Sequence, residues 1–427
     1  MIPRINKMEL VPRLAARSVV LDGQLMSVVA TIIDDVRARG DEALFDYTLR
    51  FDDVDLKHLR IENDELRRCA VGVDESVRAA LREAIANVRA FHERQVERSW
   101  SVSPSKGVQL GQRITPLERV GLYVPGGTAA YPSSVVMNVV PAQVAGVERI
   151  VVTTPPRTFA ENPAVAAALI ELNVTEVFAV GGAQAIAALA FGTETVPRVD
   201  KVTGPGNKYV AAAKKLVFGV VGIDSIAGPT EVVIVADETA RADFIAADLL
   251  AQAEHGEDAS AVLITTDESL ARNVAEEVER QARSLPRFEI VSSSLRDYGA
   301  IVVVESLDEA CALVNELAPE HVEIVTKDDE AIAGQIRHAG AIFFGSYTPE
   351  AVGDYLAGPN HVLPTGRTAR FSSALGVYDF VKRTSLLRYS AEAFSKVSDS
   401  VNLLAESEGL AGHARSALIR REGKPSS

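Results

Sequence analysis

The sequence predicts an α/β protein built on two doubly wound parallel sheets. Short runs of β-branched and apolar residues recur from residue 119 onward, and Ala-rich helical segments separate nearly every pair of runs. Such an alternation is typical of buried parallel strands whose sheets are covered by helices on both faces. The expected strands are 120–124, 150–154, 176–180 and 232–236, followed by a second series at 261–265, 300–304, 322–325 and 341–344.

The two series of strands predict two domains, spanning 120–232 and 233–375. Before them, apolar residues at helical spacing predict a helix from Leu25 to Val36, which Gly40 ends. We assign residues 17–119 to the second domain, residues 1–16 to an N-terminal arm and residues 376–427 to C-terminal helical segments. The tail has few large apolar residues, so it must pack on something else, such as another subunit.

Composition excludes several classes of function. The chain has 427 residues and a formal net charge of −14, which disfavours binding to nucleic acid or to an anionic membrane surface. No signal peptide and no apolar run of membrane-spanning length is visible, so we expect a cytoplasmic protein. Its two cysteines, Cys69 and Cys311, lie in separate helix-like segments and fit a reducing compartment.

Three glycine-rich turns follow expected strands in the first domain. They carry Tyr123, Gln184 and Asn207, within YVPGG, GGAQ and TGPGN. Such turns let backbone N–H groups approach a phosphate closely, beside the N-terminus of the next helix. No GxGxxG follows a strand, so these turns leave NAD and a phosphosugar open as alternatives.

Two pairs of polar residues in the second domain could carry chemistry. Gln252 and His255 are three residues apart at the end of an Ala- and Leu-rich helix, where a histidine is usually structural. Glu320 and His321 stand together just before an expected strand. An acid beside an imidazole suits general acid–base catalysis, and a solvated pair in a turn is the alternative.

Other polar candidates lie nearer the C-terminus. Asp354 and His361 bracket a loop rich in turn-forming residues, while Glu408 and His413 lie on the weakly apolar tail. No HExxH, CxxC or HxH spacing is present, so local motifs do not establish a metal site. Imidazole and carboxylate groups are nevertheless suitable ligands for Zn²⁺.

At these residues the chain resembles the histidinol dehydrogenase family. The matching blocks follow the family's order over nearly the whole chain: VGLYVPGGTAAYPSSVVMN, GGAQAIAALAFGT, TGPGNKYVAAAKK, AGPTEVVIVAD, LAQAEHGEDA, LAPEHVEI, GDYLAGPNHVLPTG, FSSALGVYDFVKR and EGLAGHARS. The resemblance implies two Rossmann-like domains in an intertwined homodimer. It also implies oxidation of L-histidinol through L-histidinaldehyde to L-histidine, with two NAD⁺ reduced and one Zn²⁺ bound per subunit.

The resemblance also implies a role for each candidate residue. Glu320 and His321 would be catalytic, and NAD⁺ would lie against Tyr123, Gln184 and Asn207. The zinc ligands would be Gln252, His255, Asp354 and, from the partner subunit, His413. Substrate contacts would come from Thr230, Gln252, His255, His321, Asp354, His361, Glu408 and His413. Thr230 stands where many family members have Ser, which keeps the hydroxyl and adds a methyl group.

Two alternatives remain at the level of sequence. A related zinc-dependent dehydrogenase could act on another polar alcohol, such as a sulfonated diol, although an anionic substrate should need a cation where Glu408 and His361 stand. A non-catalytic nucleotide-binding protein would keep the glycine turns but would need neither Glu320 and His321 nor the metal ligands.

Overall fold

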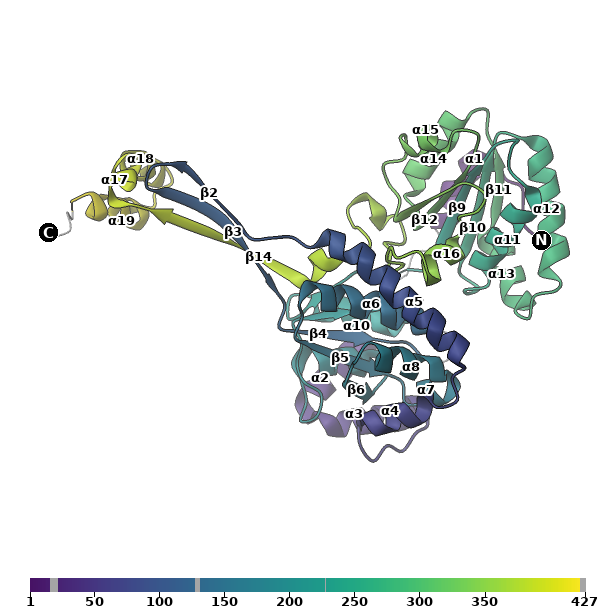
Figure 1. Ribbon diagram of the computed structural model, residues 1–427, viewed down its shortest axis with the longest axis horizontal. Helices are drawn as coiled ribbons and strands as arrows, with labels where there is room; N and C mark the ends of the chain where they lie inside the picture. The colour runs from purple at the N-terminus through teal and green to yellow at the C-terminus, as the bar shows by residue number, and fades with distance from the viewer. Residues whose placement is uncertain (16–21, 127–130, 227, 423–427) are drawn as a thin grey trace. The chain divides into compact units, whose positions relative to one another are not determined.

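The computed structural model describes residues 1–15, 22–126, 131–226 and 228–422 (Figure 1). They fall into two units, which are described separately. Unit 1 contains residues 1–95 and 117–380, and unit 2 contains residues 96–116 and 381–427 as far as they are described. The expected end of the N-terminal arm at residue 16 lies outside the described residues. None of the helices described combines the length and apolar character that a bilayer crossing requires.

The first sheet of unit 1 has six strands in the order β1-β6-β5-β4-β7-β8. Their bounds are β1 Arg60–Ile61, β4 Arg119–Tyr123, β5 Arg149–Thr154, β6 Glu176–Ala179, β7 Lys201–Thr203 and β8 Gly222–Ile223. Only β1 runs antiparallel to its neighbour. The chain winds from β4 through β5 to β6 and then reverses to β7, so the topological switch point lies between β4 and β7. Ligands of open α/β sheets bind at the carboxyl ends of the strands at such a point.

Helices cover both faces of this sheet. One core joins α2 (Gly23–Arg39), α3 (Asp41–Asp52), α9 (Gly182–Phe191) and α10 (Lys208–Val217) to one face. A second core joins α4 (Asn63–Ala70), α5 (Glu75–His92), α6 (Pro132–Ala145) and α8 (Pro163–Glu171) to the other, and the short α7 (Thr158–Glu161) precedes α8. The Ala-rich α9 is buried from Ala183 to Ala190, because its small side chains allow close packing on the sheet.

The N-terminal helices differ from the sequence-based assignment. Residues 17–119 were expected with the second sheet, yet β1 pairs with β6 of the first sheet, and α2 packs on α9 and α10. Of the described N-terminal helices, α1 (Lys7–Ala15) packs against the second sheet, where it contacts β11. An amphipathic helix shows in its sequence that one face is buried, but it does not show which sheet buries that face.

The second sheet of unit 1 has five parallel strands in the order β11-β10-β9-β12-β13. Its strands are β9 (Glu231–Ala236), β10 (Ser260–Thr265), β11 (Ala300–Val303), β12 (His321–Val325) and β13 (Ala341–Phe344). One core includes α11 (Ala242–Ala253), α12 (Glu268–Ala282) and α13 (Phe288–Tyr298), and another includes α1, α14 (Leu307–Leu317) and α15 (Asp329–Ala333). The expected class of two doubly wound parallel sheets is therefore confirmed, with the switch point of this second sheet between β9 and β12.

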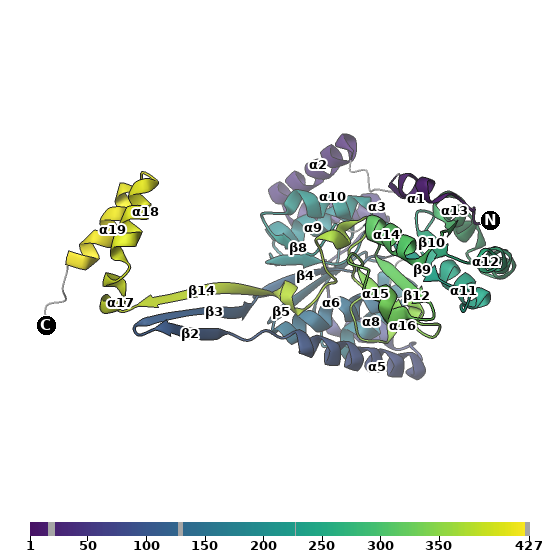
Figure 2. The same ribbon diagram turned by 90° about the horizontal axis from the view of Figure 1, so that it is seen from above.

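Unit 2 is a three-stranded antiparallel sheet followed by helices (Figure 2). Its elements are β2 (Trp100–Ser105), β3 (Val108–Pro116), β14 (Val381–Tyr389), α17 (Ala391–Ser395), α18 (Ser398–Ser407) and α19 (Ala411–Glu422). The expectation that 376–427 is helical was wrong at β14, which pairs with β3 from Val381 opposite Pro116 to Tyr389 opposite Val108. Nearly every residue of β14 is exposed, so its sequence lacks the apolar alternation that marks a half-buried strand.

A buried ion pair fixes the turn after β7. The Lys214 ammonium contacts the Asp224 carboxylate, with only 3% and 5% of the two side chains exposed. Lys214 also donates to the Gly204 carbonyl at 3.0 Å, and Asp224 accepts from the Gly204 N–H at 2.8 Å. Gly204 has φ +111°, and a Cβ there would lie 2.2 Å from the Tyr123 carbonyl oxygen. Only glycine therefore allows this turn to approach the end of β4 so closely.

We expect Lys214→Met to destabilise the protein by about 3–5 kcal/mol, because Asp224 would remain buried without its counter-ion. Lys215→Met is the matched control, since Lys215 is exposed on the same helix and should change stability by less than about 0.5 kcal/mol. Urea unfolding of the two variants measures the difference. Equal stabilities would show that the pair does not hold the turn in place.

Candidate active site

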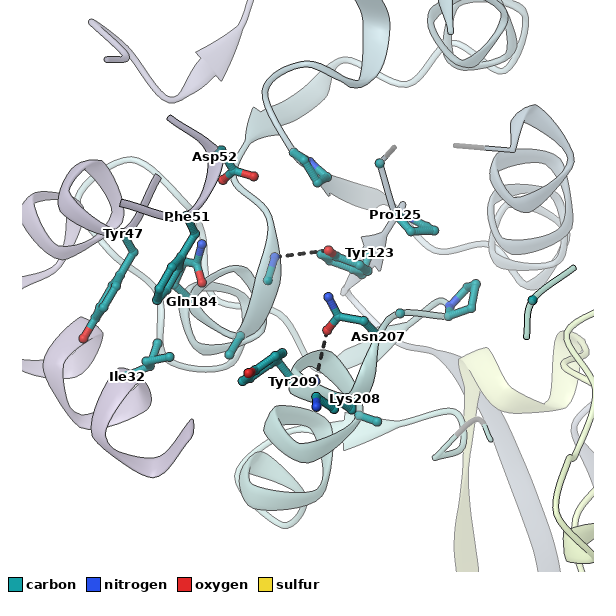
Figure 3. A pocket seen from close by; sticks show the side chains of 18 of the residues that line it. Ile32, Tyr47, Phe51, Asp52, Tyr123, Pro125, Gln184, Asn207, Lys208 and Tyr209 are labelled. Carbon is teal, nitrogen blue, oxygen red and sulfur yellow. Dashed lines mark hydrogen bonds between the residues drawn. The ribbon is translucent and has the colours of Figure 1, made fainter. Parts of the chain in front are cut away.

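The three glycine-rich turns meet at one cavity of about 1330 Å³ in unit 1 (Figure 3). It is lined by Tyr123, Gln184 and Asn207, and it extends to Thr230 and His255. The structure therefore brings the three turns together at the carboxyl edge of the first sheet, as their positions after strands predict. The last glycine of the first turn, Gly127, lies outside the described residues.

Each of the three turn residues has a distinct local role. Tyr123 is buried, its hydroxyl accepts a hydrogen bond from the Gly182 N–H at 3.1 Å, and burial raises its pKa to about 12. Asn207 caps α10 by accepting from the N–H groups of Tyr209 and Val210, which leaves its amide nitrogen available to donate. Gln184 Oε1 has no hydrogen-bond partner among the described residues. The protonated phenol and the two amides can therefore hydrogen-bond to a ligand in the cavity.

A second cavity, of about 180 Å³, lies at the amino ends of β9 and β12. Glu320 and His321 line it together with Asp354 and His361, and Thr230 and His255 line both cavities. In strand register, His321 stands opposite Val232, so Glu320 lies beside Glu231 at the start of the neighbouring strand. The acid–imidazole pair therefore belongs to a buried site, and the alternative of a solvated turn was wrong.

Glu320 is a buried carboxyl held by two hydrogen bonds. Its Oε2 accepts from Thr230 Oγ1 at 2.5 Å and from the Glu231 N–H at 3.0 Å. Burial raises the pKa of Glu320 to about 8, although the bond from Thr230 acts in the opposite direction. A carboxyl group with such a pKa can both donate and accept a proton near neutrality.

His321 presents one ring nitrogen to the cavity as an acceptor. Its Nδ1 lies 3.2 Å from the Glu231 carbonyl oxygen, so the proton must sit on Nδ1, and Nε2 carries the lone pair. Burial lowers the pKa of His321 to about 4, which keeps the ring neutral. The ring lies near two carboxyl groups, with Nδ1 3.7 Å from oxygens of both Glu320 and Glu350.

Three side chains beside this pair form a candidate metal site. Ligand atoms of His255, Glu350 and Asp354 all lie within 4.8 Å of one another. His255 Nδ1 donates to the Ala251 carbonyl at 3.0 Å, which leaves Nε2 free to bind a cation. Gln252 lies beside these three residues. In the amide orientation that satisfies its hydrogen bonds, its nitrogen donates to both Glu350 carboxylate oxygens, at 2.6 and 2.7 Å.

Electrostatics favours a cation at this site. Burial raises the pKa of Glu350 well above its usual range, and the negative charges of Asp354 and Glu320 raise it further. Behind Glu350, burial also raises the pKa of Glu323 and that of Asp248, the latter to about 6. Neither lysine nor arginine is among the residues that line the smaller cavity. A divalent ion would compensate this concentration of buried acid, and imidazole with carboxylate is a donor set that Zn²⁺ accepts.

Glu350 is the site residue that sequence reasoning missed. It opens α16 (Glu350–Tyr355), and Asp354 lies one turn further along the same helix. Two carboxylates at i and i+4 share a helix face, so this spacing was a usable signal. The helix has only six residues and follows a turn, so no apolar periodicity revealed it.

The loop after α16 is held in place by contacts with α5 and α6, two helices that cover the first sheet. Asn360 donates to the Met137 carbonyl at 2.6 Å and lies 3.4 Å from Nε2 of the buried His92. The next residue, His361, lines the smaller cavity, and its Nε2 has no hydrogen-bond partner among the described residues. This anchoring fixes His361 on the wall of the cavity, where it can meet a polar substrate.

Two of the predicted residues lie in unit 2. Glu408 is the residue that ends α18, and His413 lies in the first turn of α19; both side chains are exposed. The structure therefore gathers Thr230, Gln252, His255, Glu320, His321, Asp354 and His361 at one place in unit 1. The roles of Glu408 and His413 remain predictions.

The family model and several curated relatives similar to this chain carry one name. The family model for histidinol dehydrogenase matches residues 15–421. The histidinol dehydrogenase of Geobacillus kaustophilus is 56% identical over 92% of this chain and 93% of its own length. That of Halalkalibacterium halodurans is also 56% identical, over 93% of this chain and 94% of its own. The crystal structure of histidinol dehydrogenase from Elizabethkingia anophelis matches with a TM-score of 0.90 and 36% identity, covering 93% of this chain and 92% of that chain.

We expect the buried Glu320 carboxyl to make stability fall as pH rises from about 4.5 to about 8. The folded state holds this proton more tightly than the unfolded state does, so ionisation opposes folding. In metal-free protein, Glu320→Gln should therefore gain stability relative to wild type by about 2–4 kcal/mol more at pH 9 than at pH 5. Glu316→Gln, at an exposed position on α14, should show no such dependence. Urea unfolding at the two pH values tests this, and parallel pH profiles for all three proteins would contradict it.

Proposed function

Because the chain belongs to the histidinol dehydrogenase family, we propose that it oxidises L-histidinol to L-histidine through L-histidinaldehyde, reducing two NAD⁺. One observation carries the proposal: the neutral imidazole of His321 and the carboxyl of Glu320, with its raised pKa, lie beside a candidate metal site. Their cavity shares lining residues with the cavity along the glycine turns. An alcohol held there could lose its hydroxyl proton to the protein and a hydride from its carbon to the dinucleotide.

The first oxidation requires a base, and His321 is placed to be that base. Its Nε2 would accept the proton of the alcohol while hydride leaves the carbon for NAD⁺. The hydrogen bond from Nδ1 to the Glu231 carbonyl holds the ring in the required tautomer. That carbonyl also favours the imidazolium that forms, because it continues to accept the Nδ1 proton.

The second oxidation requires water to add to the aldehyde. Glu320 would take a proton from that water, since its raised pKa makes it a stronger base than an ordinary carboxylate. His321 would then accept the proton of the hydrate while the second hydride leaves. The balance is one water consumed and two NADH formed for each histidine.

We assign zinc to Gln252, His255, Asp354 and His413 of the partner subunit. Support comes from the mutual proximity of His255, Asp354 and Glu350 and from the surrounding acid. Ligation by Gln252 needs the opposite amide orientation, in which the amide oxygen faces the Glu350 side of the site and the nitrogen donates to Thr230 Oγ1 at 2.9 Å. Bound zinc would hold nitrogen atoms of the substrate and polarise the alcohol oxygen.

The smaller cavity favours a cationic, imidazole-bearing alcohol over an anionic one. Its lining includes Glu320, Glu350 and Asp354, while lysine and arginine are absent from it in the described part of the chain. We place Thr230, His361 and Glu408 among the substrate contacts, together with the metal ligands and His321. A sulfonated alcohol would meet this negative charge without a compensating cation.

The proposed function predicts NADH formation that depends on L-histidinol, with two NADH formed per histidine and loss of activity after a strong chelator. His321→Gln should lower kcat by about 10²–10⁴-fold, the usual contribution of a positioned base. Replacement of the exposed His58, which lies outside both cavities, is the control. Absence of turnover with L-histidinol, or unchanged turnover of His321→Gln, would rule out the proposed chemistry.

Complementation tests the proposed homodimer. If each site combines His321 of one chain with His413 of the partner subunit, His321→Ala and His413→Ala should each be inactive alone. Heterodimers of the two variants would then hold one intact site. Random pairing of co-expressed variants should therefore recover about a quarter of wild-type activity. No recovery in purified heterodimers would show that both residues act within one chain.

A further inference from the structure

The larger cavity extends beyond the glycine turns onto a wall formed by the N-terminal helices. This part of the lining includes Val28 and Ile32 of α2, Phe51 of α3 and Tyr209 of α10. The exposed fraction is 45% for Val28, 52% for Phe51 and 41% for Tyr209. An aromatic and aliphatic wall that stays exposed in a cavity suits a flat base, because stacking removes apolar surface from water.

The two ends of the cavity differ in what they can bind. One end contains Thr230 and His255, next to His321, where the carbon that loses hydride must lie. A nicotinamide ring must reach that end in the proposed reaction. The adenosine half of the dinucleotide is then directed along the turns toward Phe51 and Tyr209.

One oxygen of a carboxylate that lines the same cavity lacks a hydrogen-bond partner among the described residues. Asp52 is the last residue of α3, directly after Phe51, and its Oδ2 is buried with no hydrogen-bond partner among the described residues. Figure 3 shows Phe51, Asp52 and Tyr123 around the same part of the cavity. An unpaired buried oxygen of this kind lowers stability unless a ligand donates to it.

We propose that Asp52 binds the hydroxyl groups of the adenosine ribose and thereby selects NAD⁺ over NADP⁺; this inference rests on the proposed use of a dinucleotide. A carboxylate can accept bonds from both hydroxyls of a ribose. A phosphate on the 2′ oxygen would remove one donor and place negative charge against Asp52. In doubly wound dinucleotide sites an acidic residue about 20 residues after the glycine motif fills this role, whereas here it would come from a helix that precedes the sheet.

Three cations among the described residues line this cavity: Arg50, Arg157 and Lys208. The Arg50 guanidinium lies over the Phe51 ring, 5.3 Å from its centroid. Burial raises the pKa of the Asp52 carboxyl, and the positive charge of Arg157 lowers that pKa by a smaller amount. The Arg157 guanidinium donates to the Asp53 carbonyl at 3.1 Å and lies 4.0 Å from the Asp53 carboxylate. Lys208 opens α10 at the other side of the cavity, beside the turn where a pyrophosphate would lie.

The test compares Asp52→Asn with Asp53→Asn in the full-length protein by calorimetric titration. Asp53 is the matched control, because it is the adjacent carboxylate and its side chain is 97% exposed. Three ligands are titrated: NAD⁺, its analogue lacking the 2′-hydroxyl of the adenosine ribose, and NADP⁺. Wild type should bind NAD⁺ about 10–100-fold more tightly than Asp52→Asn does, and Asp53→Asn should match wild type.

The deoxy analogue separates a direct contact from a structural effect. For that analogue the loss caused by Asp52→Asn should shrink to less than about threefold, because the bond in question is already missing. Preference for NAD⁺ over NADP⁺ should fall by about tenfold or more in Asp52→Asn. Thermal unfolding without ligand should show Asp52→Asn no less stable than wild type, since the substitution removes a charge whose pKa burial already raises.

The inference fails if Asp52→Asn binds NAD⁺ as wild type does, if it loses equal affinity for the deoxy analogue, or if wild type prefers NADP⁺. These outcomes are distinct from failure of the proposed function. A protein that turns over L-histidinol with NAD⁺ but shows no Asp52 effect refutes the inference alone. A protein that shows the Asp52 effect in titration but does not oxidise L-histidinol refutes the proposed function alone.

Discussion

The rest of the site depends on the concentration of buried negative charge at the amino ends of β9 and β12. Glu320, Glu350 and Glu323 are all buried there, and Asp354 lies beside them. Unit charges about 4 Å apart repel one another strongly when protein rather than water surrounds them. Such a cluster is stable only if carboxyl groups keep protons or a cation joins them. The raised pKa values of Glu320 and Glu350 reflect that need: burial is the main cause, and neighbouring negative charges add to it. A bound metal ion would meet the same need in the proposed enzyme.

Helix polarity explains why the two proposed ligands, a dinucleotide and a metal ion, belong at opposite edges of their sheets. In a wound α/β sheet the helix N-termini lie at the carboxyl edge and the helix C-termini at the amino edge. The turns that hold Gln184 and Asn207 lead into α9 and α10, whose N-termini favour a pyrophosphate. Gln252 and His255 come from the C-terminal end of α11, where the carbonyl groups favour a cation. A dinucleotide and a metal ion bound as proposed would each lie where the backbone dipoles stabilise their charge.

The sequence predicted features that a few neighbouring residues determine, and it left open those that depend on which elements pack together. β-Branched runs predicted the central strands, and glycines after strands predicted the turns around Tyr123 and Asn207, because each signal lies within a few residues. Glu320 and His321 were found because they are adjacent, although only the structure shows that they are buried. Residues 22–95 were assigned to the wrong sheet, since an apolar helix face does not identify its partner. The strand β14 was missed because its partner β3 lies more than 260 residues away and neither face of β14 is buried.

The proposed four-electron reaction places opposite demands on the two cavities. NADH must leave and a second NAD⁺ must enter while the aldehyde stays bound, so the dinucleotide needs a wide path that does not release the intermediate. The cavity along the glycine turns is about 1330 Å³, whereas the one containing Glu320 and His321 is about 180 Å³. Thr230 and His255 line both, so the hydride can cross where the cavities share a wall. An aldehyde anchored in the smaller cavity is then held by contacts that the exchanging dinucleotide does not need to break. A single cavity of uniform width would instead couple release of NADH to loss of the aldehyde.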